Sequence, residues 1–408
     1  MAANNSRRDF LKGAATLAVA HSMRGVASAM ENPSSGGKVF AYLGTYTGAI
    51  GQQKNGEGIY RFEVDLQTGE FSNRELVATT TSPSWIALHP SGRFLYAINE
   101  VFDFEGSNGS VSSFAVDRAT GSLRPLNIVS SGGSGPAFMS VDASGKYAFV
   151  ANYVGGSIAV LPIRADGSLG SAIEVHHDVG AVGATHATDA PPGSFAISGH
   201  HSPHAHMVLP DLDNRFVLST DLGQDRIYSY RLHHDSGKLT PVPGQPFVHL
   251  PTGDGPRHFV FHPNRRWFYS VEEEASTVTF FHYDSSRGTL HAQQKISALP
   301  PGYTGTNFSS EIALAPSGRV LYAANRLHNT ISVFRIGSDG RLTFAGESPT
   351  MGDYPRTFRI DPTGKFLFAC NQYTDNITCF RINQDDGLLS FTGRYIPAPT
   401  PVCLIFLT

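Results

Sequence analysis

Apolar and polar residues alternate with a period of two in many short runs of this chain. Six of these runs are comparable and end in Asn, Asp or Glu: residues 94–99, 147–152, 216–221, 267–272, 320–325 and 366–371. Turns rich in Gly, Asp, Ser and Asn separate the runs, as at Asp339-Gly340 and Asp386-Gly387. Short alternating runs between such turns are typical of antiparallel strands. The sequence therefore predicts an all-β protein.

One of the predicted strands returns along the chain as an eight-residue segment with a Pro or Ser start, an apolar middle and usually a Pro end. The seven copies begin at Pro83, Pro136, Pro203, Pro256, Ser309, Pro355 and Pro401. Their starts lie 46 to 67 residues apart, which is a spacing typical of propeller blades and not of helical solenoids. Further alternating runs follow each of the first six copies, so each repeat is expected to form a four-stranded antiparallel blade. We predict a seven-bladed β-propeller.

The seventh copy ends with the last residue, Thr408, which leaves no room for three more strands. Three alternating runs that lack such a first strand stand at the other end of the chain, at residues 38–44, 58–64 and 70–77. We therefore expect residues 401–408 to be the innermost strand of the N-terminal blade. This pairing closes the ring and removes exposed sheet edges.

Composition agrees with one propeller domain. Seven blades of about 50 residues each account for residues 38–408. The 42 glycines and 25 prolines suit short strands joined by tight turns. The net charge of −3 gives no indication of a nucleic-acid partner or of an anionic membrane surface, where a basic stripe would be expected.

The N-terminus has the features of an export signal. Residues 6–12 read Ser-Arg-Arg-Asp-Phe-Leu-Lys, a complete twin-arginine motif, and a small-residue site follows at Ala27-Ser28-Ala29. We expect residues 1–29 to be a twin-arginine signal read by the twin-arginine export machinery, and residues 30–37 to be a linker. The apolar segment is shorter than the roughly 20 residues that span a bilayer. The processed protein is expected to be periplasmic or secreted and not bound to a membrane.

Two positions differ in chemistry from blade to blade, and such positions are where a site could be built. Directly after the first residue of each eight-residue segment stand Ser84, Ala137, His204, Arg257, Ser310, Arg356 and Val402. Directly after the second run stand Glu100, Tyr153, Leu222, Glu273, Arg326 and Gln372. The first position begins the innermost strand and the second ends its antiparallel neighbour. We expect both sets at one end of the ring, beside its channel.

The charged members of these two sets predict an anion-binding site. Arg257, Arg326 and Arg356 carry guanidinium forks that suit carboxylate or phosphate. His204 can act as a general base near neutral pH, and Glu273 can orient it, pair with an arginine or act as an acid. Ion pairs that merely join the blades are the alternative, which we favour for a single Arg–Glu pair but not for the whole set.

The longest repeat contains an insertion, residues 181–198, and many histidines: His176, His177, His186, His200, His201, His204 and His206. Because this stretch is rich in loop residues, a rim loop or lid is favoured over a zinc or copper site, and we expect no metal. Cys370 and Cys379 could pair across a hairpin, but with Cys403 they are better explained as buried side chains on strands.

Several motifs resemble those of one known family. They are residues 42–47 (Tyr-Leu-Gly-Thr-Tyr-Thr), 202–206 (Ser-Pro-His-Ala-His), 255–258 (Gly-Pro-Arg-His), 271–273 (Val-Glu-Glu), 324–326 (Ala-Asn-Arg) and 401–403 (Pro-Val-Cys). With them the chain resembles the lactonase family of seven-bladed propellers, which includes propeller-type 6-phosphogluconolactonases and carboxymuconate cyclases. The resemblance implies catalytic roles for His204, Arg257, Glu273 and Arg326, without a metal or an organic cofactor.

The resemblance implies hydrolysis of a sugar lactone, with a small anionic lactone or sugar acid as the partner of the site. In this hypothesis Arg257 and Arg326 hold the anionic group and stabilise the oxyanion, and His204 takes a proton from water. Further substrate contacts are expected from Arg356, Gln372, Glu100, His206 and His258. An exported relative could act on an unphosphorylated aldonolactone, because phosphogluconolactone belongs to cytoplasmic metabolism.

Two other functions stay open. The family's other branch cyclises muconates to lactones, and the same His and Glu could move a proton on carbon. A noncatalytic propeller could instead bind an acidic sugar or a protein at its rim, although anion capture alone needs no His and Glu beside the arginines.

Overall fold

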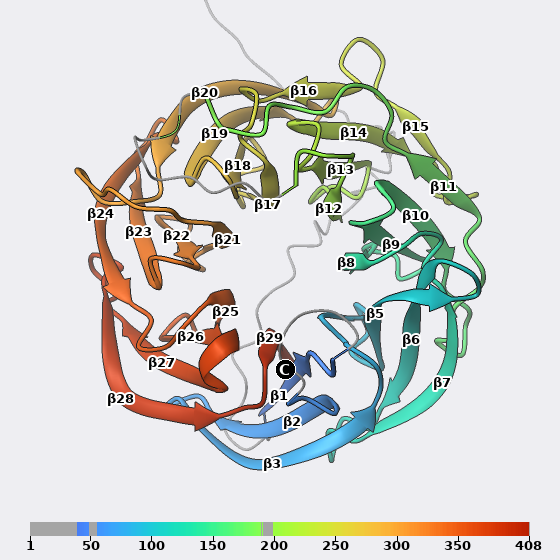
Figure 1. Cartoon of the computed structure of the whole chain (residues 1–408). Helices are drawn as coiled ribbons and strands as arrows, with labels where there is room; N and C mark the ends of the chain where they lie inside the picture. The colour runs from blue at the N-terminus through green and yellow to red at the C-terminus, as the bar shows by residue number, and fades with distance from the viewer. Residues whose placement is uncertain (1–38, 49–54, 189, 191–198, 408) are drawn as a thin grey trace, which may run out of the picture. The chain divides into compact units, whose positions relative to one another are not determined.

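Seven antiparallel β-sheets stand around a central axis in the computed structural model, which describes residues 39–48, 55–188, 190 and 199–407. Figure 1 shows the sheets as the blades of a ring, with the chain passing from blade to blade in sequence order. Chain contacts group Lys38–Thr408 into one unit and Met1–Gly37 into another. The predicted export signal (1–29) and linker (30–37) lie outside the described residues. The predicted seven-bladed propeller is confirmed.

Each blade has an innermost strand beside the axis and a second strand next to it. The innermost strands are β29 (Pro401–Leu407), β4 (Trp85–Leu88), β8 (Pro136–Val141), β12 (Ala205–Pro210), β17 (Pro256–Phe261), β21 (Ser309–Leu314) and β25 (Pro355–Ile360). The second strands are β1 (Val39–Thr45), β5 (Phe94–Phe104), β9 (Tyr147–Asn152), β13 (Phe216–Asp221), β18 (Trp267–Glu272), β22 (Val320–Asn325) and β26 (Phe366–Asn371).

The third and outermost strands complete the blades. The third strands are β2 (Gly58–Asp65), β6 (Asn108–Val116), β10 (Ser157–Pro162), β14 (Arg226–Leu232), β19 (Thr277–Asp284), β23 (Thr330–Ile336) and β27 (Asn376–Ile382). The outermost are β3 (Glu70–Thr79), β7 (Leu123–Ser130), β11 (Glu174–His177), β15 (Leu239–Pro241) with β16 (Phe247–His249), β20 (Thr289–Ser297), β24 (Leu342–Pro349) and β28 (Leu389–Pro397). In the fourth blade both β15 and β16 pair with β14, so the outer edge there is split.

The C-terminal strand closes the ring as predicted. β29 pairs with β1 from Phe40↔Leu407 to Thr45↔Pro401, and the sheet order is β29-β1-β2-β3. Val402, Leu404 and Leu407 of this strand are buried. The first blade is therefore made from both ends of the propeller unit, and no inner strand is left unpaired.

Neighbouring blades are joined by a repeated contact between a turn and an aromatic residue. The turn between the third and fourth strands contains a glycine with positive φ, such as Gly288 at 74°. A Cβ added to Gly288 would lie 2.4 Å from Cδ1 of Phe216, the first residue of the second strand in the preceding blade. In four blades a buried tyrosine also donates a hydrogen bond to the next turn, as from Tyr269 Oη to the Gly340 carbonyl at 2.8 Å. Glycine is required here because a side chain would separate the blades.

Other predictions concern cysteines and helices. Cys370, Cys379 and Cys403 are free and buried, so the preferred interpretation as buried side chains on strands is confirmed. The described residues contain one short 3-10 helix, η1 (Gln372–Thr374), and none of their helices is long and apolar enough to cross a membrane.

Deleting residues 401–408 tests the closure. The deletion removes the burial of Val402, Leu404 and Leu407, each of which contributes about 1.5–3 kcal/mol. We expect the melting temperature, followed by circular dichroism, to fall by roughly 10 °C or more. A chain without residues 1–37 is the control and should melt like the full protein. Equal melting of the two truncated chains would contradict the closure.

Candidate active site

A β-bulge recurs at the start of the innermost strands. The pairing with the second strand shifts between Pro136 and Phe138, Ala205 and Met207, Pro256 and His258, Ser309 and Ile312, and Pro355 and Thr357. The residues left without a partner in the ladder include Arg257 and Arg356. A bulge re-aims a side chain that regular alternation would place elsewhere. This irregularity brings charged side chains from several blades to one end of the ring.

The register corrects one prediction. The sequence repeats predict that His204 occupies the same position as Arg257, and this prediction is wrong. Ala205 pairs with Asp221 in the way that Pro256 pairs with Glu272. His206, and not His204, therefore occupies the bulge position. His204 precedes its strand, and its carbonyl accepts the Leu222 amide just as the Gly255 carbonyl accepts the Glu273 amide. The cause is that the third copy of the repeat, which starts at Pro203, begins two residues earlier relative to its strand pairing than the copy at Pro256.

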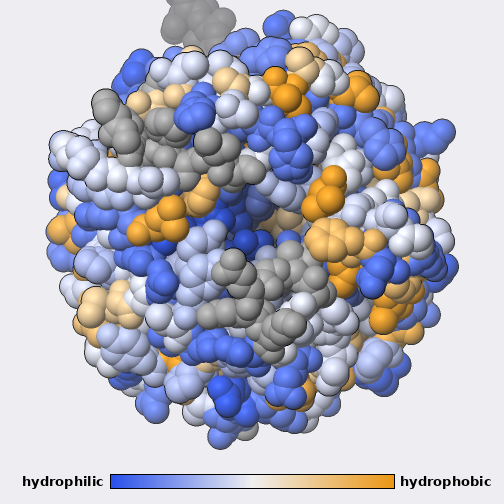
Figure 2. Space-filling model, in the orientation of Figure 1, coloured by the Kyte–Doolittle hydropathy of each residue, from blue (hydrophilic) through white to orange (hydrophobic). Residues whose placement is uncertain are grey.

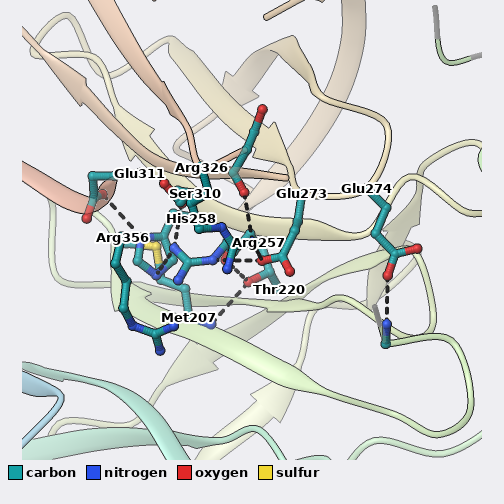
Figure 3. A network of polar contacts seen from close by, with 12 residues as sticks. Met207, Thr220, Arg257, His258, Glu273, Glu274, Ser310, Glu311, Arg326 and Arg356 are labelled. Carbon is teal, nitrogen blue, oxygen red and sulfur yellow. Dashed lines mark hydrogen bonds and ion pairs between the residues drawn. The ribbon is translucent and has the colours of Figure 1, made fainter. Parts of the chain in front are cut away.

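Glu273 joins two of the predicted arginines. Its Oε2 atom lies 2.9 Å from Nε of Arg257 and 2.7 Å from Nη2 of Arg326. Figure 3 shows both guanidinium groups directed at this carboxylate. Burial would raise the pKa of Glu273, but the charges of Arg326 and Arg257 outweigh it and hold the pKa below its usual value. Glu273 is therefore a permanent anion between two buried cations.

Arg257 is the most deeply buried of the cations. It is 2 % exposed, and its Nη1 atom donates to the Ser310 carbonyl of the next blade. Burial and the charge of Arg326 lower the pKa of Arg257 to about 10. Among the described residues no hydrogen bond engages its Nη2 atom. Arg257 thus remains charged at neutral pH and keeps one donor available for a ligand.

Arg326 is held in an aromatic box. Its guanidinium lies 5.2 Å from the ring centres of both Phe308 and Tyr354, and it donates to Tyr354 Oη at 3.3 Å and to the Ser309 carbonyl at 3.4 Å. Such cation–π contacts stabilise a desolvated guanidinium. Burial would lower the pKa of Arg326, but the charge and hydrogen bond of Glu273, with the oxygen of Tyr354, outweigh burial and raise the pKa above its usual value.

Arg356 is more open than the other two arginines. Its Nη2 lies 3.7 Å from Oε2 of Glu100, and its guanidinium lies 5.1 Å from the ring centre of Tyr46, which donates to the same carboxylate at 2.9 Å. Its side chain is 16 % exposed. Arg356 makes no hydrogen bond within the described part of the chain, so its donors can serve a ligand.

One residue further along the innermost strands, aromatic side chains from different blades contact one another. The ring of His258 lies 5.2 Å from that of Trp85, 5.4 Å from that of Phe138 and 5.0 Å from that of His206, all measured between centroids. We call Trp85, Phe138 and His258 the plug. These residues belong to three different blades, so aromatic rings from across the ring meet next to Arg257.

His258 supports Arg257 from within the plug. Its Nδ1 atom lies 3.1 Å from Oε1 of Glu311, and its Nε2 atom lies 3.4 Å from Nη1 of Arg257. Burial lowers the pKa of His258 to about 4, although Glu311 opposes the shift. A neutral ring with hydrogen on Nδ1 can accept from Arg257 at Nε2. The structure gives His258 this supporting position, at 1 % exposure, and not an open face toward a substrate.

His204 stands beside Tyr153 in a fixed orientation. The two rings stack with centroids 4.3 Å apart, and Nδ1 of His204 lies 2.8 Å from the Tyr153 carbonyl. Nδ1 therefore carries the hydrogen, and Nε2, 3.1 Å from Ser202 Oγ, is the acceptor. Burial lowers the pKa of His204 below its usual value, so the ring is neutral at pH 7.

His206 lies nearer to the arginines. Its ring meets the edge of Tyr153 at 5.4 Å, and burial with the charge of Arg257 lowers its pKa well below the usual value. Its Nδ1 atom is buried without a hydrogen-bond partner. The same is true of Oε1 of Gln372, the first residue of η1.

His200, in the histidine-rich repeat, makes two buried contacts that the sequence did not predict. Nδ1 of His200 lies 2.7 Å from Oε2 of Glu274, and Nε2 lies 3.0 Å from Oδ1 of Asp225. Burial opposes protonation, but these two carboxylates raise the pKa of His200 to about 9. Within the described residues no group of three or more His, Cys, Asp or Glu side chains could hold a metal ion.

We use the name axial cup for the space that lies above the plug and is bounded by Arg257, Glu273, Arg326, Arg356 and His206. Seen along the ring axis, the molecule is hollowed at its centre, and the residues in the hollow are hydrophilic (Figure 2). Sequence comparison missed Tyr46, Tyr354 and Glu311, which hold the charges of the cup. Glu311 gave one available signal, because it is a charged residue within an otherwise apolar strand segment.

Comparison with known proteins identifies the family. Residues 40–406 match the family model described as "Lactonase, 7-bladed beta-propeller". A 6-phosphogluconolactonase of Bacillus subtilis is 32% identical over 91% of this chain and 99% of its own, and one of Formosa agariphila is 30% identical over 78% and 86%. The structure of the periplasmic gluconolactonase PpgL of Pseudomonas aeruginosa superposes with a TM-score of 0.79 and 28% identity, over 91% of this chain and 99% of that one. The chain belongs to the lactonase family of seven-bladed β-propellers.

Proposed function

We propose that the protein hydrolyses a sugar lactone in the axial cup. The observation that carries the proposal is the Glu273 carboxylate between Arg257 and Arg326, near the neutral ring of His206. The names of the relatives support the reaction type. Anion binding alone would be better served by arginines without a competing carboxylate.

The arginines would stabilise the charge that forms when water attacks the lactone carbonyl. Arg257 keeps Nη2 available, and Arg356 has no hydrogen bond within the described residues, so both can donate to the developing oxyanion. In a water-poor site a fixed donor of this kind contributes about 3 kcal/mol to the transition state. Glu273 holds Arg257 and Arg326 in place before the reaction begins.

His204 would act as the general base. Water gives one proton to Nε2 of His204 while its oxygen bonds to the carbonyl carbon. The ring C–O bond then breaks, and the same proton passes to the departing ring oxygen, which leaves a hydroxy acid. The Tyr153 carbonyl fixes the required tautomer, as the third member of a base relay commonly does.

Replacing His204 by Ala tests the base. We expect kcat in a pH-stat assay with an aldonolactone to fall about 100-fold or more. In the unchanged protein kcat should stay constant as the pH falls to neutrality and should decline only in acid solution, because the lowered pKa of His204 keeps the ring neutral until the pH is below the usual histidine pKa. His177→Ala, at an exposed position on β11, is the matched control. Full activity of His204→Ala would end this assignment.

Replacing Glu273 by Gln tests the bridge between the arginines. The amide keeps the shape but removes the charge that offsets two buried cations, and such a loss costs about 3 kcal/mol or more of stability. We expect a lower melting temperature and a fall in kcat/KM of about 100-fold. Glu347→Gln removes a partly exposed partner of His328 and should change neither quantity appreciably. Equal behaviour of the two variants would contradict the proposed role.

We also propose that the protein acts in the periplasm or outside the cell after twin-arginine export. The proposal rests on residues 6–12 and on the small-residue site at 27–29. Replacing Arg7 and Arg8 together by Lys should retain the protein in the cytoplasm as an unprocessed chain, measured by cell fractionation. Unchanged export of this double variant would refute the assignment.

A further inference from the structure

One backbone position recurs in every blade shortly before the innermost strand. Its carbonyl group accepts the amide of the residue that the repeats place directly after the second strand, as the Tyr354 carbonyl accepts the Gln372 amide at 3.1 Å. The residues at this position are Ser82, Gly135, His204, Gly255, Phe308, Tyr354 and Thr400. Because these hydrogen bonds involve the second of the two variable positions, all seven residues lie at the end of the ring that carries the axial cup.

The backbone at this position is left-handed in five of the blades. φ is positive at Ser82 (40°), Gly135 (54°), Gly255 (67°), Tyr354 (61°) and Thr400 (39°). Glycine adopts this conformation without steric cost, whereas a bulky side chain strains it. Two of the five residues are glycines and two carry small hydroxyl side chains, so Tyr354 is the one large side chain among them. A single blade does not require this strain, and strained residues cluster at functional sites.

The surrounding structure fixes Tyr354 and directs its side chain to the cations of the cup. Its amide donates to Oδ1 of Asn329 at 2.8 Å. The guanidinium of Arg326 lies 5.2 Å from its ring centre, and Nη1 donates to its hydroxyl oxygen at 3.3 Å. Tyr373 stacks on the same ring, with centroids 4.4 Å apart. The side chain is partly exposed, whereas the other four left-handed residues are buried. The strained backbone therefore presents a phenol to the axial cup.

The hydroxyl group of Tyr354 keeps its hydrogen available. Burial would lower the pKa of Arg356, but Tyr46, Glu100 and Tyr354 raise it above its usual value, so the phenol lies beside this guanidinium as well as that of Arg326. Guanidinium groups only donate, so the phenol oxygen faces them and its hydrogen is directed away. Among the described residues no acceptor takes that hydrogen. Neighbouring cations polarise the O–H bond and make it a stronger donor.

We propose that Tyr354 is a catalytic residue of the lactone hydrolysis, and that its hydroxyl donates a hydrogen bond to the carbonyl oxygen of the lactone as this oxygen becomes negative beside Arg356. The inference rests on the lactone hydrolysis proposed above. The phenol keeps its proton throughout, so the path of the proton through His204 is unchanged. Because the bond strengthens as negative charge develops, it acts chiefly in the transition state.

The variant Tyr354→Phe tests this role in the full chain. It keeps the ring, the stack on Tyr373 and the cation–π contact with Arg326, and removes only the hydroxyl. In a pH-stat assay with D-glucono-1,5-lactone or its 6-phosphate, we expect kcat to fall about 100-fold. KM and the melting temperature should stay nearly unchanged, because the lost bond belongs to the transition state. Tyr395→Phe, at a 51% exposed position on β28, is the control and should keep full activity.

The possible failures differ in what they overturn. An unchanged kcat in Tyr354→Phe, or a loss of kcat together with a clearly lower melting temperature, would overturn the role of Tyr354 and leave the hydrolase intact. If the unchanged protein releases acid from neither lactone, the lactone hydrolysis itself is overturned, and this inference falls with it.

Binding of D-gluconate, measured by isothermal titration calorimetry, tests the donor without turnover. The gluconate carboxylate stands for the oxyanion, because it brings one negative charge on oxygen to the same donors. Tyr354→Phe should weaken gluconate binding about tenfold, as expected for a lost hydrogen bond to a charged group. Tyr395→Phe should bind like the unchanged protein. Equal affinity of Tyr354→Phe and the unchanged protein, or no binding by either, would contradict the proposed donor.

Discussion

The carboxylate of Glu273 between the guanidinium groups of Arg257 and Arg326 is the interaction on which the centre of this propeller depends. Two buried cations from different blades would repel each other and would lose their hydration without a compensating interaction. One anion that contacts both, at 2.9 and 2.7 Å, removes most of that penalty. It also joins the fifth blade to the sixth at the axis. The same carboxylate therefore holds the blades together and sets the geometry of the proposed site.

Propeller architecture explains how such a group can form from residues far apart in the sequence. Every innermost strand begins at the same end of the ring, and in most blades a bulge there turns one or two side chains out of the regular alternation. Arg257 and Arg356 occupy this position in their blades, while Arg326 and Glu273 follow the ends of second strands. The plug of Trp85, Phe138 and His258 lies next to these charges, and the burial of Arg257, Glu273 and Arg326 strengthens the interactions between them.

The sequence was sufficient for the architecture because the repeat is strong and the first and last strands of the propeller share one blade. The arginines and Glu273 could be selected from the same repeats, since a charge at a position that varies between blades is not required by the fold of a single blade. The position of His204 relative to Arg257 could not be predicted, because a bulge and a two-residue offset do not change the pattern of apolar residues. The supporting position of His258 and the roles of Tyr46 and Tyr354 depend on contacts across the axis, which no local pattern encodes.

In the proposed mechanism a lactone and its acid product bind in the axial cup against Arg257 and Arg356. A crystal structure of the protein soaked with D-gluconate measures this most directly. We predict the gluconate carboxylate within hydrogen-bond distance of both guanidinium groups, above the plug. Gluconate ordered only on the outer faces of the blades, with the axial cup holding solvent alone, would contradict it.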